Sequence, residues 1–192
     1  EKFVKLDKKL EKLPDKVKYQ YTINDKLHYA LGKDINRTFF RNKMLIKHGK
    51  SLLNNVNNML SLLDKEYSIL ESQEKIIDDI KSAAEKMSFM VEKNKKNMAM
   101  RLGYLLKRKS DLLRQNIQSQ IESFNLDEKV GKYAIKCGKG LMSIKNFKDE
   151  YHSLNKKAEN FALISLNNED ELRNSYNEAA ELMREYEEIV NL

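Results

Sequence analysis

The fold is decided by residues 56–112, which read VNNMLSLLDKEYSILESQEKIIDDIKSAAEKMSFMVEKNKKNMAMRLGYLLKRKSDL. An apolar residue recurs at every seventh position of this stretch, at Val56, Leu63, Leu70, Ile77, Ala84, Val91, Met98, Leu105 and Leu112. A seven-residue apolar repeat of this length is typical of long helices that pack side by side along one seam. The stretch therefore predicts an all-α protein, an elongated, antiparallel helical bundle that resembles a coiled coil.

The composition favours the same class of fold. The chain of 192 residues contains one Pro, six Gly and no Trp, and 34% of its residues are charged. So few turn-forming residues leave little room for a β-rich fold with many turns. We expect one domain of about four long helices in residues 34–192, preceded by an N-terminal arm in residues 1–33.

The N-terminal arm is expected to mix helical and extended segments. Apolar residues at helical spacing predict an amphipathic helix in residues 1–13, and Pro14 is expected to end it, because a Pro inside a helix costs about 3 kcal/mol. Residues 15–23 alternate apolar and polar side chains, which predicts an extended segment laid along the bundle. A short second helix is expected to stop at Gly32.

Further helix boundaries are predicted from polar residues. Asp34 is expected to cap the first long helix, whose apolar face is predicted to include Phe39 and Phe40. Residues 56–112 form either one helix or a hairpin, and we favour a turn near Asp64–Ser72 over one at Glu92–Asn97. Two more helix ends are expected at Asn125–Glu128 and at Leu166–Asn168, and an acidic last helix follows the second.

Small residues are expected where helices pack closely. Gly49 interrupts the first long helix, which predicts either a kink or a close helix contact. Cys137 is the only cysteine, so no intrachain disulfide forms, and its heptad spacing from Val130 predicts a buried, unreactive thiol. Close helix approach or local bending is also expected at Gly131, Gly138 and Gly140.

The sequence contains no pattern of catalytic residues. The three histidines, His28, His48 and His152, lie on separate segments, and none has a second ligand at the spacing of a zinc site. We find no phosphate-binding loop, dinucleotide fingerprint or nucleophile elbow, and no short reading helix for specific nucleic acid. We therefore expect no catalytic residue, no metal site, no cofactor and no enzymatic activity.

Charge is distributed unevenly along a chain of net charge +7. Residues 1–50 carry 14 Lys or Arg against 6 Asp or Glu, whereas residues 151–192 carry 4 against 9. These two parts can neutralise each other by packing, or the basic part can bind a polyanion or an anionic lipid. The densest basic cluster comprises Arg101, Lys107, Arg108, Lys109 and Arg114. It either pairs with the acidic last helix or is the candidate site for an anion or a partner.

One stretch resembles a known family. Residues 34–60 contain Asp-Ile-Asn-Arg-Thr-Phe-Phe and Ser-Leu-Leu-Asn-Asn-Val-Asn-Asn-Met-Leu. The pattern of a basic residue before two large apolar residues, followed by regularly spaced leucines, resembles a helix of the CspA-like, plasmid-encoded outer-surface lipoproteins of Borrelia. The resemblance implies a non-enzymatic helical virulence domain on the outer surface, with some relatives binding complement regulators, and it assigns no binding residues. Because the sequence starts at Glu1 without an initiator Met, we expect a fragment or a processed form, and the resemblance implies a signal peptide and a lipid-bearing Cys upstream.

Two alternatives remain open on the same residues. Long heptad helices with a positive balance are compatible with a dimer of the BAR type that curves anionic membranes, which requires dimers and salt-sensitive lipid binding. They are equally compatible with a cytoplasmic coiled-coil scaffold that binds a helical protein partner. The oligomeric state is not predicted.

Overall fold

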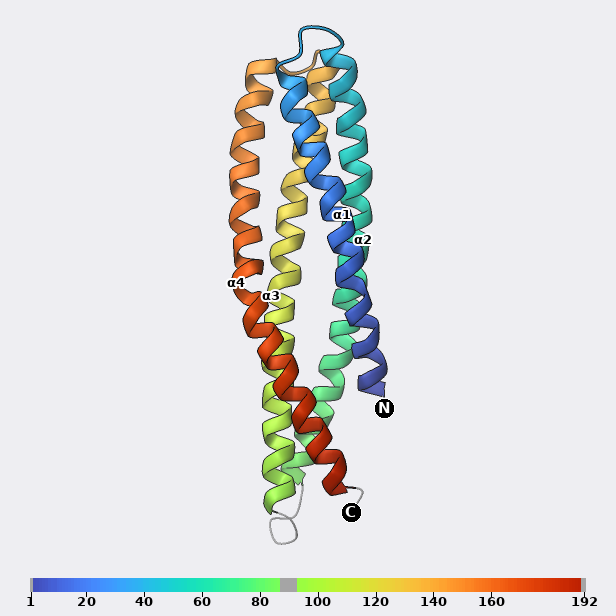
Figure 1. The fold of residues 1–192 in the computed structure, drawn as a ribbon, viewed down its shortest axis with the longest axis vertical. Coiled ribbons are helices and arrows are strands. Elements are labelled where there is room, and N and C mark those ends of the chain that lie inside the picture. The colour runs from blue at the N-terminus through green and yellow to red at the C-terminus, as the bar shows by residue number, and fades with distance from the viewer. Residues whose placement is uncertain (1, 87–92, 191–192) are drawn as a thin grey trace. The chain divides into compact units, whose positions relative to one another are not determined.

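The computed structural model describes residues 2–86 and 93–190 (Figure 1). These residues form four helices and no strand: α1 (Lys2–Ile35), α2 (Arg41–Lys86), α3 (Lys93–Gly138) and α4 (Ile144–Val190). The all-α helical bundle predicted from the apolar repeat is confirmed. Among the described residues, no helix combines the length and the apolar character that crossing a membrane requires.

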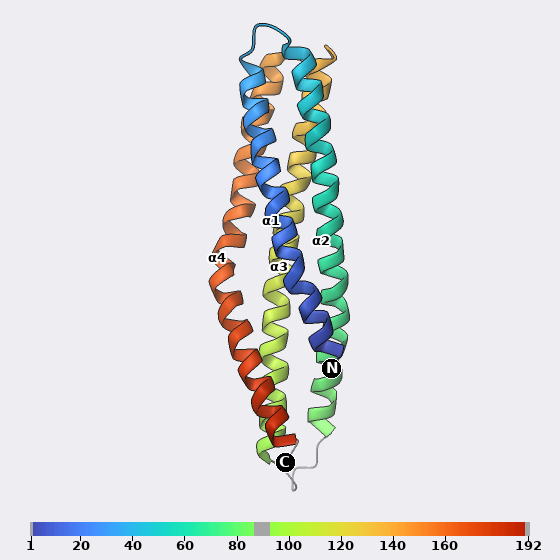
Figure 2. The same ribbon diagram turned by 45° about the vertical axis from the view of Figure 1, so that its right-hand side comes forward.

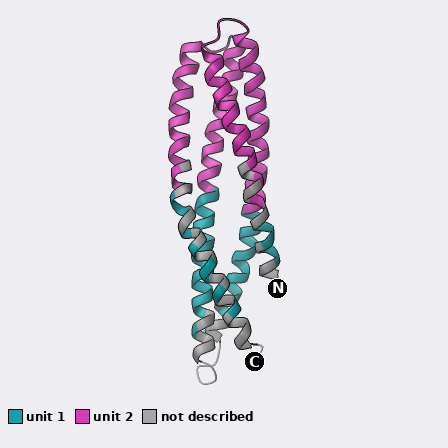
Figure 3. Ribbon diagram, in the orientation of Figure 1, with its two compact units in different colours: residues 1–11, 67–117, 165–192 teal, residues 12–66, 118–164 magenta. Residues whose placement is uncertain are grey.

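The helices contribute to two compact units (Figure 3). Unit 1 comprises residues 1–11, 67–117 and 165–192, and unit 2 comprises residues 12–66 and 118–164. All four helices supply a segment to each unit.

Unit 2 is a four-helix bundle with two short connections. Residues 36–40 join α1 to α2 and residues 139–143 join α3 to α4, so the helices of each pair run antiparallel (Figure 2). The predicted seam lies inside, because Val56 and Leu63 are fully buried. The other large buried side chains of this unit are Leu31, Leu45, Leu52, Met59, Phe124, Val130, Phe147 and Leu154.

Glycine brings α2 and α3 into close contact within unit 2. A Cβ added at Gly49 would lie 2.9 Å from the carbonyl oxygen of Gly131, and one added at Gly138 would lie 2.6 Å from that of Asn42. Neither position has room for a side chain, since a carbon and an oxygen atom at such distances overlap. Close helix contact is therefore the reason for Gly49, Gly131 and Gly138.

Unit 1 is built on the continuation of the seam. Ile77 of α2 packs with Leu102, Leu105 and Leu106 of α3 in a buried apolar cluster, and Ile76 covers its edge. Leu70 and Ile117 are also buried in this unit. The seven-residue repeat thus correctly predicts the interior at Leu70, Ile77 and Leu105, whereas the side chains of Ala84, Val91 and Met98 lie outside the described part of the chain.

The predicted elements of residues 1–33 are wrong in their detail. α1 runs without interruption from Lys2 to Ile35, so Pro14 does not end a helix and residues 15–23 are helical rather than extended. Leu10 and Leu13 on the preceding turn are both buried, and burial of two leucines offsets the roughly 3 kcal/mol that an interior Pro costs. The separation of residues 1–33 from residues 34–192 as domains stays a prediction.

The favoured turn near Asp64–Ser72 is also wrong. α2 continues through these residues to Lys86, and within the helix the Ser72 side chain donates a hydrogen bond to the Ser68 carbonyl. α2 and α3 are nevertheless separate helices, as the hairpin alternative requires. The polar stretch at Glu92–Asn97 largely forms the first turn of α3, which begins at Lys93, whereas residues 87–92 lie outside the described residues.

Three other predicted boundaries fall inside helices. α3 passes through Asn125–Glu128, and α4 passes through Leu166–Asn168. Asp34 lies near the end of α1 instead of capping a helix, and its side chain is completely buried. The true boundary between the last two helices is at residues 139–143, where Gly140 has φ +77°. Hydrogen bonds from Leu141 N to Lys136 O and from Gly140 N to Cys137 O close the C-terminus of α3.

The connection from α1 to α2 presents two aromatic side chains to solvent. Phe39 is 80% exposed and Phe40 is 75% exposed, although the sequence predicts both on the apolar face of a helix. Phe40 has φ 57°, a left-handed conformation that costs a bulky residue about 1–2 kcal/mol. Its carbonyl accepts a hydrogen bond from Met44 N at the start of α2, so this backbone conformation begins the helix and leaves the ring outside the core.

Candidate binding surfaces

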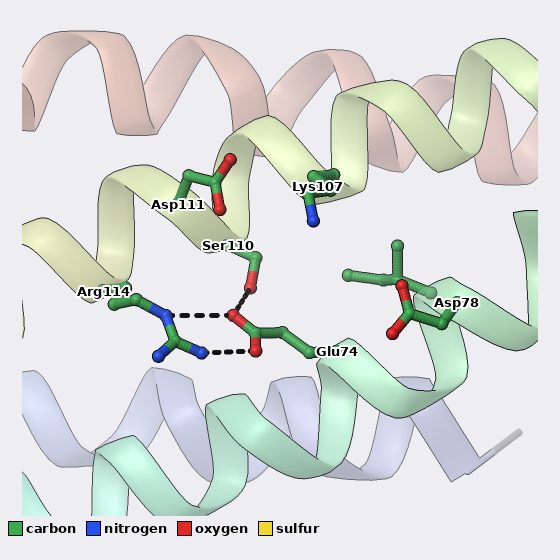
Figure 4. Close-up of a pocket in the computed structure, with 7 residues that line it drawn as sticks. Glu74, Asp78, Lys107, Ser110, Asp111 and Arg114 are labelled. Atoms are coloured by element: carbon green, nitrogen blue, oxygen red, sulfur yellow. Dashed lines mark hydrogen bonds and ion pairs between the residues drawn. The ribbon is translucent and has the colours of Figure 1, made fainter.

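A small polar groove lies between α2 and α3 in unit 1 (Figure 4). Glu74 is its centre: Arg114 Nε donates to Oε1 at 3.2 Å, a second Arg114 nitrogen donates to Oε2, and Ser110 Oγ donates to Oε1 at 3.0 Å. Arg114 also donates to the Tyr67 hydroxyl at 2.6 Å. The groove is lined by Glu74, Ile77, Asp78, Lys107, Ser110, Asp111 and Arg114.

The charges of this groove are engaged with one another. The hydrogen bond from Arg114 lowers the pKa of the Glu74 carboxyl, and Ser110 and Lys107 lower it further. The same pair raises the pKa of Arg114. The groove has a volume of about 190 Å³, which is below the range of about 300–1,000 Å³ usual for small-molecule sites. It therefore fits an interhelical ion pair better than a substrate.

The predicted basic cluster does not form one free face. Arg108 is exposed and pairs with Glu171 of α4, in line with the expectation that the basic cluster and the acidic last helix neutralise each other. Lys109 is only 4% exposed and has an interaction partner. Arg114 is held by Glu74, whereas Arg101 and Lys107 are exposed. Anion binding by Arg101, Lys107, Arg108, Lys109 and Arg114 stays a prediction.

A second, wider groove lies between α1 and α2 in unit 2. Its volume is about 550 Å³, which falls inside the usual range for binding sites. Tyr19 is 67% exposed on one side of it, and Leu62 lies on the other. The full lining is Lys16, Tyr19, Gln20, Asn58, Ser61, Leu62 and Lys65. Tyr19 and Leu62, with two lysines in the same lining, distinguish this groove, here named the α1–α2 groove, from the one in unit 1.

The interior of unit 2 contains a polar network that the sequence reading missed. Asp127 of α3 accepts hydrogen bonds from Asn24 Nδ2 and from His28 Nε2 of α1, both at 2.9 Å. Asn55 of α2 donates to the Asn24 side chain at 3.3 Å, and the hydroxyl of Tyr151 of α4 donates to the His28 carbonyl at 2.8 Å. All four helices are thus joined through Asn24, His28 and their partners.

A second buried pair joins α1 and α2 in the same unit. The Asp34 carboxylate contacts His48 Nδ1, and Arg37 Nε lies 3.0 Å from its other oxygen. Spacing along the sequence could have revealed both acidic residues: Asp127 lies three residues after Phe124 and three before Val130, and Asp34 lies three after Leu31, so both share the buried face of their helix. These histidines have structural partners, and among the described residues no three His, Cys, Asp or Glu side chains gather as a metal site.

Cys137 is buried and Tyr21 is half-buried, and neither has a reactive environment. Burial raises the pKa of the Cys137 thiol, which the charge of Arg41 lowers by a smaller amount, so the predicted buried thiol is confirmed. Burial and the nearby Asp127 also raise the pKa of Tyr21, whose ring packs 5.0 Å from that of Phe124. His152, the third histidine, is exposed on α4.

Comparison with known proteins does not add a relative. No protein family, curated protein or solved structure matches the chain.

Proposed function

We propose that this chain is a non-enzymatic interaction domain on a bacterial outer surface, where it binds a host protein. The proposal is supported by the α1–α2 groove of unit 2, which offers an exposed Tyr19 and a partly buried Leu62 with Lys16 and Lys65 beside them. Tyrosine is enriched at protein-binding hot spots because it supplies a large apolar area and a polar tip. The surface location rests on the resemblance of residues 34–60 to the Borrelia lipoproteins.

The lining of the groove defines the partner's chemistry. A channel between two antiparallel helices accommodates a third helix or an extended segment, whose apolar side chains would contact Tyr19 and Leu62. Lys16 and Lys65 favour carboxylates on that segment and disfavour basic ones. The partner is therefore a protein with an exposed, acidic, amphipathic segment.

Binding to purified complement regulators tests the proposal directly. The chain would be immobilised, and binding compared between the original chain and a Tyr19→Ala, Leu62→Ala double variant. Loss of a hot-spot aromatic and its apolar neighbour is expected to weaken binding at least tenfold. The matched control is Tyr104→Ala, which removes an equally exposed tyrosine from unit 1. If the original chain does not bind, the proposed partner is contradicted. If the double variant and the control bind equally, the proposed groove is contradicted.

Surface display is tested separately. Protease added to intact bacteria that express the full-length protein should remove this domain while a periplasmic marker survives, and labelled palmitate should be incorporated upstream of it. Survival of the domain in intact cells would contradict the proposal and favour the cytoplasmic scaffold. The scaffold and the BAR-type dimer stay predictions without a specific observation in their favour.

A further inference from the structure

One end of unit 2 combines exposed apolar side chains with a cluster of basic side chains. The connections 36–40 and 139–143 both lie at this end (Figures 1 and 2). They are neighbours in space, because Gly138 at the end of α3 packs against the Asn42 carbonyl and Ile46 at the start of α2. We define the basic tip as residues 35–43 together with residues 136–148.

The basic tip exposes three large apolar side chains from two different connections. Phe39 and Phe40 come from the first, and Leu141, which is 74% exposed, comes from the second. The left-handed backbone of Phe40 holds its ring outside the core. A bulky residue retains such a conformation where the surrounding structure or a function requires it.

The charge of the basic tip has one sign only. Its two segments contain seven basic residues and no Asp or Glu: Arg37, Arg41, Lys43, Lys136, Lys139, Lys145 and Lys148. Six of these side chains are exposed, and Arg41 is half-buried. The nearest acidic residue before the first segment, Asp34, is fully buried between His48 and Arg37, so it adds no negative charge to the surface. Asp149 and Glu150, which follow the second segment on α4, are exposed and bound the basic tip on that side.

We infer that the basic tip docks on a bilayer that carries anionic lipid, with Phe39, Phe40 and Leu141 inserted among the headgroups. Apolar side chains at the end of a rigid bundle reach the boundary between headgroups and acyl chains, while lysines and arginines around them bind the phosphates. The apolar side chains and the positive charge reinforce each other, because insertion brings the exposed lysines of the basic tip to the membrane surface. This inference does not depend on the α1–α2 groove.

The composition of this surface favours a bilayer over a protein as the occupant. Two phenylalanines and one leucine at these exposures present roughly 400 Å². A standard protein interface takes about 800 Å² from each partner, of which a little over half is apolar, so the area alone does not decide the occupant. Lysine is depleted at protein interfaces, whereas shallow insertion into anionic lipid requires basic side chains around the apolar ones, as the basic tip provides.

Vesicle sedimentation tests the inference. The chain is expected to sediment with vesicles of phosphatidylcholine mixed with phosphatidylglycerol, to remain in solution with phosphatidylcholine alone, and to lose binding as salt is raised. A Phe39→Ser, Phe40→Ser double variant should bind the anionic vesicles about tenfold more weakly. The matched control, Tyr29→Ser with Leu163→Ser, removes two exposed apolar side chains from helix surfaces of the same unit and should bind as the original chain does.

The electrostatic part has its own matched pair. Lys139→Glu with Lys145→Glu should weaken binding at least tenfold, whereas Lys156→Glu with Lys157→Glu, farther along α4, changes the net charge equally and should have a much smaller effect. Equal losses from both pairs would show that binding follows net charge alone and would overturn the assignment to the basic tip.

The absence of Trp from the chain allows a direct depth measurement. Phe39→Trp and Leu141→Trp should each give an emission that shifts to the blue on anionic vesicles and is quenched by brominated acyl chains, and Tyr29→Trp should give neither. Failure to bind anionic vesicles, or an unshifted emission at both tip positions in bound protein, would overturn the inference. Loss of complement-regulator binding in the Phe39→Ser, Phe40→Ser variant with vesicle binding intact would assign the tip to a protein and would also overturn it.

Discussion

The pKa values of two carboxylates on α2, one in each unit, are shifted in opposite directions. Glu66 in unit 2 is 6% exposed, and burial alone raises the pKa of its carboxyl to about 7. Glu74, eight residues later in unit 1, accepts hydrogen bonds from Arg114 and Ser110, which lower its pKa. The two residues lie on one helix, so the difference arises from what packs against them rather than from the helix itself.

The same contrast extends to the interiors of the units. Unit 2 buries a network centred on Asp127 and brings α2 against α3 through glycines. Unit 1 contains an apolar cluster around Ile77, and its Glu74–Arg114 ion pair lies in a groove that water can reach. Buried polar groups are costly to leave unpaired, whereas a group at the surface regains its hydrogen bonds from water. Substitutions in unit 2 should therefore have the larger effects.

The largest effect is expected at Asp127. Asp127→Ala removes the acceptor of Asn24 and His28 inside unit 2, and we expect it to lower the free energy of unfolding by about 3 kcal/mol. Urea denaturation followed by circular dichroism measures this change. Asp149→Ala on the exposed side of α4 is the matched control and should change stability by less than about 0.5 kcal/mol. Similar effects of the two substitutions would show that the buried network does not stabilise unit 2.

Gly138 tests the packing of α2 against α3. Gly138→Ala places a Cβ 2.6 Å from the carbonyl of Asn42, and the forced separation of the helices should cost about 2–3 kcal/mol in a urea titration. Gly140→Ala is the comparison: nothing lies within 4 Å of the new Cβ, but the φ of +77° is unfavourable for alanine, so the cost should be about 1 kcal/mol. A larger loss at Gly140 than at Gly138 would contradict the close helix contact.

Glu66 gives unit 2 a stability that depends on pH. Its pKa is about 7 in the folded chain and 4.5 by default, so the folded state holds the proton more tightly, and stability falls as pH rises from about 4.5 to about 7. Glu66→Gln removes this penalty and should stabilise the chain by about 2 kcal/mol at pH 8, with almost no change at pH 4. Urea titrations at the two pH values measure the difference. Equal effects at both would show that Glu66 ionises normally.

The sequence predicts the class of fold and much of the interior. The seven-residue repeat correctly identifies Val56, Leu63, Leu70 and Ile77 as buried, because burial of a helix face depends on periodicity alone. Helix ends are harder to predict. Asp127 satisfies the sequence rules for a cap but is paired across the bundle with α1, and no local pattern distinguishes these two uses of a carboxylate.

The surfaces depend on register, which a single sequence does not specify. Arg114 was identified as part of a basic cluster, but its neutralisation by Glu74 requires α2 and α3 to pair forty residues apart. Phe39 and Phe40 were assigned to a buried helix face by their apolar character, and only the position of the connection at residues 36–40 exposes them. Composition thus predicts which residue types occur in the basic cluster and in the connection at residues 36–40. The packing of the helices decides which of these side chains stay exposed.

The smallest effect is expected at Glu74 in unit 1, and it gives the sharpest test of the comparison with Glu66. Because the pKa of Glu74 is lowered, its contribution to stability is present at neutral pH and is lost as pH falls below the ordinary carboxyl range. Glu74→Gln should therefore destabilise the chain at pH 7 and have little effect at pH 3, which is the opposite of Glu66→Gln. The pair is partly exposed, so solvent screening should keep the loss below about 1 kcal/mol. In urea titrations across this pH range, Glu74→Gln should lower the free energy of unfolding, whereas Glu66→Gln should raise it. Changes of the same sign in both variants would mean that Arg114 does not lower the pKa of Glu74.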